Sequence, residues 1–342
     1  MPARSPGEPH DAQGPREPIS LSPDELAIAK SVIYASLFEY PLTLDQLHQA
    51  LVESAQTPAG IHATYCSSWE LALIIEYRDG FFFPRGERAF IDLRRQREAR
   101  SRAFLERHRR LLRLVCAVPY TRMVALSGSI AHSNLEGGGD LDLFIVTRGP
   151  HVWSVTVAVL VLARLLRRRR VLCANFVLSD THLEFTQQDL FTANQVIHLR
   201  PLIGGSLLDD ILAANPFIAR LYPNFRVPET PGAQPAPFAQ GAPGPWLERM
   251  KALAERVCVG PSRLVEVLCR HAYTWHLGRR AATWQSPEQV QRQPDCLKLH
   301  TQSHRRSILD RFDRALRDAL GRAARARPPA AAAAPRRRAA RR

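Results

Sequence analysis

Apolar and polar positions alternate with helical spacing soon after the start of the chain. Ser22 followed by Pro23 and two acidic residues predicts the beginning of a helix, with the Ser22 side chain as its cap. Apolar residues then recur at three- and four-residue intervals until Pro41, which ends the pattern. Thr43 is a candidate cap for a second, shorter helix over 44–51. We therefore expect two short helices near the N-terminus.

A third helix and a hairpin complete this region. The helix is expected around 67–75, and Asp79-Gly80 beside an aromatic run over 81–83 is a hairpin signal. Three helices and a hairpin over 21–91 resemble a winged helix-turn-helix module. Such modules bind DNA through the third helix, but 67–76 contains no Lys or Arg to meet phosphates. This composition favours a packing or protein-interaction role over DNA recognition.

The middle of the chain alternates between strand-like and helix-like patterns. The order is βαβαββ, which predicts a small mixed sheet covered by helices. Together with the helices on either side, this indicates an α+β fold. The expected strands are 121–126, 141–147 and a hairpin over 171–186, and the expected helices are 152–166, 188–198 and 207–214.

The helix over 152–166 is the most apolar segment of the chain. Its fifteen residues are fewer than the roughly 20 that are needed to span a bilayer. Packing behind the sheet is the favoured interpretation, and an interfacial helix anchored by Arg167–Arg170 is the alternative. We expect no transmembrane span.

The last third of the chain is expected to be helical and basic. Six prolines in 226–245 predict a linker. The helical region 246–320 contains patterns at 246–257, 261–277 and 295–319, within which Arg270, His271, Lys298 and His300 are candidate contacts for a base or an acceptor. The two ends, 1–20 and 321–342, are expected to be disordered, and the second carries eight arginines and no acid. The domain boundaries therefore fall near 21, 92, 226, 246 and 321.

Charge and cysteine usage limit the partners and the compartment. The 342 residues carry a formal net charge of +15, and the segment 92–116 is a strongly basic connecting helix. Basic patches of this kind meet polyanions, so nucleic acid is a candidate partner for the helix and the tail, although a solvated face is the commoner explanation. The six cysteines have no metal-ligand spacing, and the first twenty residues lack the apolar core of a signal peptide. Both observations favour a cytoplasmic protein.

One short stretch carries the chemistry. Gly128-Ser129 forms a turn, and Asp140 and Asp142 open the apolar strand 141–147. Residues i and i+2 of a strand point the same way, so the two carboxylates share one face. Paired carboxylates repel each other unless a cation lies between them, and hard oxygen ligands suit Mg²⁺. The alternative interpretation, without a metal site, is an ordinary turn followed by a solvated strand end.

These residues resemble the signature of the polymerase-beta-like nucleotidyltransferase superfamily. That signature is Gly-Ser, about ten residues, and Asp-x-Asp between apolar positions, and Gly128, Ser129, Asp140 and Asp142 match it. The resemblance implies that the turn holds the phosphates of a nucleoside triphosphate, most simply ATP. It further implies that the aspartates bind Mg²⁺ or Mn²⁺ while a nucleotidyl group passes to an acceptor hydroxyl on a protein, a small molecule or RNA. His132, four positions after Gly128, is a candidate phosphate contact.

The chain departs from this pattern at the third carboxylate. The next core strand offers Asn175 at the corresponding position, where an amide can coordinate but cannot act as a base. If Asp180-Thr181 is a hairpin loop, Val177 lies opposite Glu184, which brings Glu184 to the same face as Asn175. Glu184 is then a candidate for the third catalytic carboxylate. The alternative is that its side chain is only exposed to solvent. The departure leaves two functions open, a nucleotidyltransferase and a catalytically weakened nucleotide-binding regulator.

Overall fold

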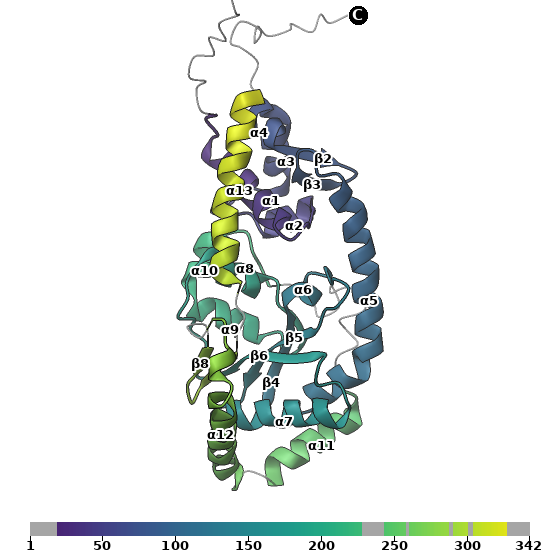
Figure 1. Cartoon of the computed structure of the whole chain (residues 1–342), viewed down its shortest axis with the longest axis vertical. Helices are drawn as coiled ribbons and strands as arrows, with labels where there is room; N and C mark the ends of the chain where they lie inside the picture. The colour runs from purple at the N-terminus through teal and green to yellow at the C-terminus, as the bar shows by residue number, and fades with distance from the viewer. Residues whose placement is uncertain (1–18, 228–242, 258–259, 287–289, 300–303, 327–342) are drawn as a thin grey trace, which may run out of the picture.

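The computed structural model describes residues 19–227, 243–257, 260–286, 290–299 and 304–326, apart from the side chain of Asn175. Helices and strands are both present, and the molecule is elongated, with a small N-terminal module at one end (Figure 1). A six-stranded mixed sheet lies near the middle, and helices cover the other end. The expected disordered start, most of the Pro-rich linker and residues 327–342 of the tail lie outside the described residues.

The N-terminal module combines four helices with a three-stranded sheet. Both predicted caps are present, since Ser22 and Thr43 each form a reciprocal capping box with the residue three positions later. The expected third helix is α4, but α3 precedes it with Thr57 as its cap and Pro58 in its first turn, a signal that sequence reading missed. The elements are α1 (Pro23–Ser36), β1 (Leu42–Thr43), α2 (Leu44–Gln49), α3 (Pro58–Ser67), α4 (Trp69–Ile74), β2 (Ile75–Arg78) and β3 (Phe81–Pro84), with the sheet order β1-β3-β2.

The C-terminal helix α13 (Arg305–Ala326) completes the core of this module. Ile308 and Phe312 are buried in the same cluster as the apolar residues of α1 and α4. The predicted helix over 295–319 is therefore wrong at its start, where 296–299 form a strand, and the basic tail does not begin at 321. The apolar stripe of α13 could be read from sequence, but the strand before it pairs with residues more than a hundred positions earlier.

A long helix, α5 (Ala89–Cys116), connects the module to the sheet along one side of the molecule (Figure 1). Two of its arginines are buried rather than solvated. Arg94 donates hydrogen bonds to the carbonyl of Pro41 and to Gln46, and Arg97 pairs with Glu39 at 2.6 Å. These arginines fasten the helix to the module instead of lining a nucleic-acid path.

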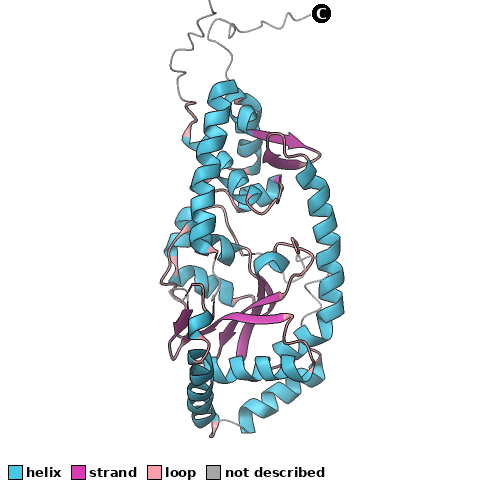
Figure 2. Ribbon diagram, in the orientation of Figure 1, coloured by secondary structure: helices cyan, strands magenta, loops and turns pink. Residues whose placement is uncertain are grey.

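The central sheet has the order β7-β4-β5-β6-β9-β8, with helices around it (Figure 2). Its one parallel pair is β5 with β6, and the other neighbours are antiparallel. The elements are β4 (Thr121–Ser127), α6 (Gly128–Ala131), β5 (Leu141–Thr147), α7 (Val152–Leu165), β6 (Leu172–Ser179), α8 (Leu190–Ile197), β7 (Arg200–Ile203), α9 (Leu207–Ala214), α10 (Pro216–Leu221), α11 (Pro245–Val257), α12 (Ser262–Gly278), a 3-10 turn (Ala281–Thr283), β8 (Val290–Arg292) and β9 (Cys296–Leu299).

The predicted hairpin over 171–186 does not form. The Asn215 side chain accepts a hydrogen bond from the backbone N–H of Phe185 at 2.8 Å and donates one to the carbonyl of Leu183 at 2.8 Å. These bonds and the burial of Phe185 hold the segment toward α9 and α10. The edge of β6 is left to β9, which pairs with it in antiparallel register.

Helix α7 packs behind the sheet, as expected. Val152, Val155, Val159 and Ala163 are buried with the apolar residues of β4, β5 and β6. Within the described ranges, no helix is both long enough and apolar enough to cross a membrane.

We expect Phe312→Ala to destabilise the fold by about 3 to 4 kcal/mol, because a buried aromatic ring leaves a cavity when it is truncated. The ring of Phe312 lies edge-on to that of Tyr34, with 5.4 Å between centroids, so the change removes packing between α13 and α1. Urea unfolding measures the loss. Arg317→Ala, at an exposed position of the same helix, is the control and should change stability by no more than about 0.5 kcal/mol. Equal effects of the two changes would contradict the packing of α13 on the module.

Candidate functional site

The Gly-Ser turn lies directly against one of the two aspartates. Register between β4 and β5 pairs Ser127 with Asp142, so the turn that follows Ser127 begins beside this carboxylate. Gly128 has a φ of +63°, and a Cβ atom built on it would lie 2.5 Å from Oδ2 of Asp142. Both the backbone conformation and the lack of space require glycine at this position. The turn and the aspartate therefore form one unit.

Asp140 and Asp142 come together with a third side chain that sequence reading did not select. Cys173 of β6 pairs with Asp142 across the parallel ladder, and its thiol donates a hydrogen bond to Oδ2 of Asp140 at 3.0 Å. Candidate ligand atoms of the three half-buried residues all lie within 4.8 Å of one another. Burial, together with the nearby Asp140 carboxylate, raises the pKa of Asp142 to about 7. Two carboxylates held this close favour either a proton or a cation between them.

The donor set offers a cation the carboxylate oxygens of Asp140 and Asp142 and the sulfur of Cys173. Carboxylate oxygens suit Mg²⁺ and Mn²⁺, whereas thiolates suit softer metals. Burial and the hydrogen bond to Asp140 raise the pKa of the Cys173 thiol to about 12, so the sulfur stays protonated at neutral pH. Asp140 and Asp142 are thus residues that could hold a hard divalent cation, and the Cys173 thiol donates a hydrogen bond to Asp140.

A cavity of about 630 Å³ opens beside the turn, which is a size typical of small-molecule sites. Gly128, Ser129 and Asp142 line it from the sheet. The N-terminal module contributes Tyr34, Phe38 and Tyr40, α8 contributes Thr192, Asn194 and Gln195, and α13 contributes Ser307, Ile308 and Arg311. The site is therefore closed by segments from both ends of the chain.

His132 lies in this cavity but is not a cation at neutral pH. Its ring packs on that of His198 at 4.1 Å between centroids, and it lies edge-on to Tyr40. Burial, His198 and Arg200 hold the pKa of His132 well below its usual value, and burial lowers the pKa of His198 to about 4. His132 is placed near the turn, as expected, but as a neutral imidazole that would contact a phosphate only as a hydrogen-bond donor.

The two other candidate residues differ in their outcome. The hairpin that was expected to carry Glu184 toward the aspartates does not form. Glu184 is exposed on the segment held by Asn215 and borders a small hollow with Phe176 and Lys298. Asn175 lies in β6 at a register shift between the Ala174 and Phe176 pairings, and its side chain lies outside the described residues.

Lys298 is a cation of the cavity that sequence reading assigned to a helix. It lies on β9, donates to Oε1 of Gln187 at 2.7 Å and sits over the ring of Phe176. Burial lowers the pKa of this ammonium group to about 8. Of the other candidates, Arg270 and His271 lie on α12, and His300 lies outside the described residues. Lys298 could be located only through the pairing of β6 with β9.

Comparison of the chain with protein-family models, curated proteins and solved structures gives no match.

Replacing Gly128 by Ala should destabilise the protein by about 2 to 3 kcal/mol, because a side chain in the left-handed region is strained and the new Cβ meets Asp142. Thermal and urea unfolding measure the change. The matched control is Gly137→Ala, where a Cβ meets nothing within 4 Å and the loop is exposed. If both variants behave like the parent, the turn does not press against the aspartate.

Replacing Lys298 by Met should increase the free energy of unfolding at pH 7 by about 1 kcal/mol, because the buried ammonium loses hydration in the folded state. Between pH 8 and 10.5 the unfolded chain binds more protons at Lys298 than the folded protein does. The destabilisation that the charged Lys298 causes is therefore lost as the pH rises through this window. The advantage of the variant should shrink accordingly.

The control for this change is Lys30→Met, which removes a surface lysine paired with Glu53 and should have an effect below about 1 kcal/mol at either pH. Urea unfolding of parent and variants at pH 7 and at pH 10 makes the comparison. An advantage of Lys298→Met that is the same at both pH values would exclude the burial of a charged amine.

Proposed function

We infer that this chain is a divalent-cation-dependent nucleotidyltransferase that transfers a nucleoside monophosphate group from a nucleoside triphosphate, most simply ATP, to an acceptor hydroxyl. The observation that supports the proposal is the contact between the Gly128 backbone and the Asp142 carboxylate on the wall of a ligand-sized cavity. A chain turn that offers backbone N–H groups beside paired carboxylates joins a phosphate contact to a cation site.

The arrangement of strands supports a nucleotidyltransferase fold for the sheet. The turn connects antiparallel strands β4 and β5, the aspartates open β5, and the next strand, β6, is parallel to it after a covering helix. The N-terminal sheet order β1-β3-β2 supports a winged-helix-like module. In this module α4 packs against α13, with Leu71 and Ile74 in the shared core, which favours a packing role over DNA recognition.

The reaction forms one bond and breaks one. The acceptor oxygen bonds to the α-phosphorus, the bond from that phosphorus to the bridging oxygen breaks, and pyrophosphate leaves while the hydroxyl proton passes to solvent or a base. The turn at Gly128-Ser129 would position the β- and γ-phosphates. Lys298 and Arg311 line the same cavity and would offset the charge of the triphosphate.

Asp140 and Asp142 would hold Mg²⁺, which when bound supplies Lewis-acid stabilisation of the phosphate charge. The chain itself contributes the pairing of the two carboxylates and the thiol that fixes Asp140. Because burial and Asp140 raise the pKa of Asp142 to about 7, the pair is ready to accept a positive partner at neutral pH.

A second candidate function, a nucleotide-binding regulator without transferase activity, is favoured by one observation. The third side chain beside the aspartates is the protonated thiol of Cys173, and Glu184 lies elsewhere. Because the N-terminal module lines the cavity, a bound nucleotide would shift the equilibrium between positions of the module relative to the sheet. Such a regulator would need no base to deprotonate an acceptor hydroxyl.

Asp140→Asn and Asp142→Asn should each lower Mg²⁺-dependent pyrophosphate release by about a thousandfold or more, since an amide oxygen carries no charge to hold the cation. The assay uses labelled nucleoside triphosphates with protein, RNA and cell extract as acceptors. Asp180→Asn, outside the cavity on the turn after β6, is the control and should retain turnover. Full activity of either site variant would reject the proposed mechanism.

Cys173→Asp separates the two candidate functions. If a transferase lacks only a third carboxylate, the new acid should increase Mg²⁺-dependent turnover, whereas Cys173→Ser should leave it unchanged. Calorimetric titration with ATP and Mg²⁺ measures binding in the same samples. Tight binding with no turnover in the parent and in both variants would favour the regulator, and the absence of binding would reject both functions.

A further inference from the structure

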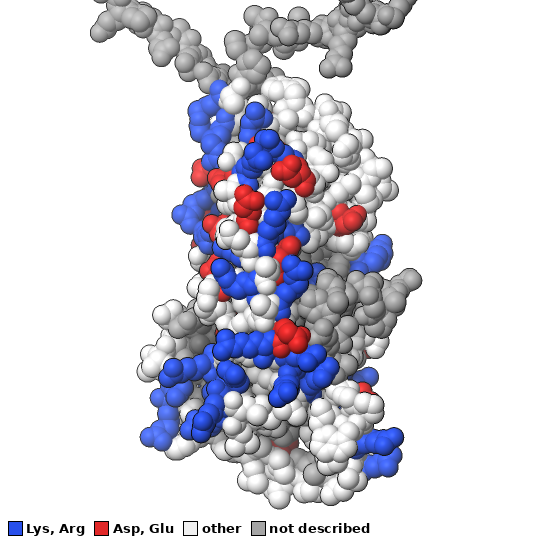
Figure 3. Space-filling model, turned by 90° about the vertical axis from the view of Figure 1, so that its right-hand side faces the viewer, with Lys and Arg blue, Asp and Glu red and all other residues white. Residues whose placement is uncertain are grey.

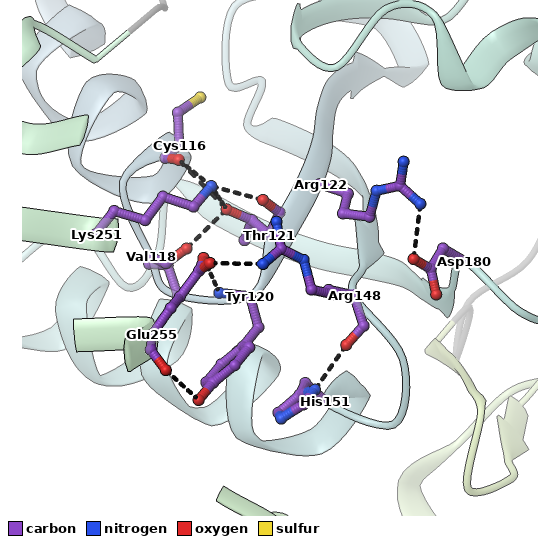
Figure 4. A network of polar contacts seen from close by, with 10 residues as sticks. All are labelled: Cys116, Val118, Tyr120, Thr121, Arg122, Arg148, His151, Asp180, Lys251 and Glu255. Carbon is purple, nitrogen blue, oxygen red and sulfur yellow. Dashed lines mark hydrogen bonds and ion pairs between the residues drawn. The ribbon is translucent and has the colours of Figure 1, made fainter. Parts of the chain in front are cut away.

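Helix α11 turns charged side chains toward the protein and its apolar side chains toward solvent. Its charged side faces the protein, where Lys251 donates hydrogen bonds to the carbonyl and the hydroxyl of Thr121 (Figure 4). Glu255 accepts a hydrogen bond from the N–H of Tyr120 at 2.8 Å and pairs with Arg148 at 3.0 Å. An amphipathic helix normally turns its apolar side chains toward the protein, whereas α11 turns the half-buried Lys251 and Glu255 inward.

The apolar side of α11 faces solvent. Trp246, Met250, Leu253 and Val257 follow at intervals of four, three and four residues, so they share one stripe, and their exposed fractions run from 45% to 71%. None of the residues of α11 is buried. Contiguous exposed apolar surface of this kind is typical of a site that contacts a partner or a membrane.

Helix α12 repeats the arrangement. Its inner side holds Glu266, which accepts hydrogen bonds from the N–H groups of Trp153 and Ser154 at the start of α7. Its outer side carries Leu264, Leu268 and Trp275, again at intervals of a helical turn or two, and each of these is more than half exposed. Two successive helices at the same end of the molecule therefore present apolar stripes (Figure 1).

The charges that remain outside are mostly positive. Of the three acids in the two helices, Glu255 and Glu266 are used on the inner side, which leaves Glu248. The exposed arginines of this end are Arg249, Arg256, Arg263, Arg279 and Arg280, with Arg164, Arg167, Arg169 and Arg170 near the end of α7. Figure 3 shows Lys and Arg along the α5 side of the molecule, with few Asp or Glu among them in the lower half of this view.

We propose that the end of the molecule formed by α11, α12 and the end of α7 docks on the surface of an anionic lipid bilayer. Exposed apolar stripes with tryptophan, flanked by arginine, match the requirements of an interfacial helix. A second copy of the chain fits less well, because its basic rim would meet an identical basic rim. The stripes would enter the headgroup region while the arginines contact lipid phosphates. The cavity beside the Gly128 turn lies between the sheet and the N-terminal module, outside this contact.

Vesicle flotation with the full chain tests this proposal. The probes are vesicles of phosphatidylcholine alone and vesicles in which one third of the lipid is phosphatidylglycerol. We expect the parent to float with the anionic vesicles and not with the neutral ones. The double variant Leu253→Glu/Leu268→Glu should reduce the bound fraction by about tenfold or more, since each glutamate places a charge in the apolar contact.

The matched control is Ala99→Glu/Ala103→Glu, which adds the same charge at two exposed positions of α5. This control and the parent should bind alike, because Ala99 and Ala103 lie on α5 and not in the apolar stripes. All three proteins keep the arginine-rich C-terminus, so its contribution to binding is the same in each. Circular dichroism checks that the helices are intact in each. Equal binding of the two double variants, or no binding by the parent, would overturn the proposal. A dimer in analytical ultracentrifugation that Leu253→Glu/Leu268→Glu dissociates, with no vesicle binding, would assign the stripes to self-association instead.

Discussion

The candidate site depends on one steric constraint, the absence of a side chain at Gly128. The backbone of this residue lies so close to the Asp142 carboxylate that there is no room for even one methyl group between them. Its φ of +63° is a conformation that glycine adopts without strain. Because Ser127 and Asp142 are paired across β4 and β5, the constraint is set by the sheet and not by a flexible loop. The turn, the carboxylates and the thiol of Cys173 are consequently positioned by three adjacent strands.

The cavity beside this unit is formed by long-range contacts that hold the two ends of the chain together. Helix α13 joins the core of the N-terminal module, and Arg97 of α5 bonds both to Glu39 of that module and to Asn134 of the loop that follows the turn. A buried arginine is costly to desolvate unless its hydrogen bonds are satisfied, so these contacts fix the loop relative to the module. A ligand in the cavity would therefore contact strands β4 and β5 and the N-terminal module at once.

At the end of the molecule formed by α11 and α12, the usual arrangement of polar and apolar side chains is inverted. There the ionic residues of α11 and α12 form the inner contacts, and the apolar residues remain at the surface. The fold can tolerate this because buried carboxylates are satisfied by backbone N–H groups and by arginine. The hydrophobic pattern of the two helices is thus regular, but it points away from the core. Pattern alone gives the stripe of a helix and not the direction in which it faces.

Local signals were sufficient for most of the elements. The caps at Ser22 and Thr43, the strand over 141–147 and the helix α9 were predicted from residues within a few positions of one another, because capping and periodicity are short-range effects. Gly128 and Asp142 were expected near each other from the resemblance to the nucleotidyltransferase signature, and the pairing of neighbouring strands β4 and β5 brings them together. The tertiary structure alone decided the rest. Cys173 lies beside the aspartates because β6 pairs with β5 in parallel register, which sets Cys173 next to Asp142. Glu184 lies on the segment that Asn215 holds away from β6, and the free edge of β6 pairs with β9, which brings in Lys298. Pairings across a hundred residues, and the choice of which helix face is buried, depend on competition between distant partners that no local pattern records.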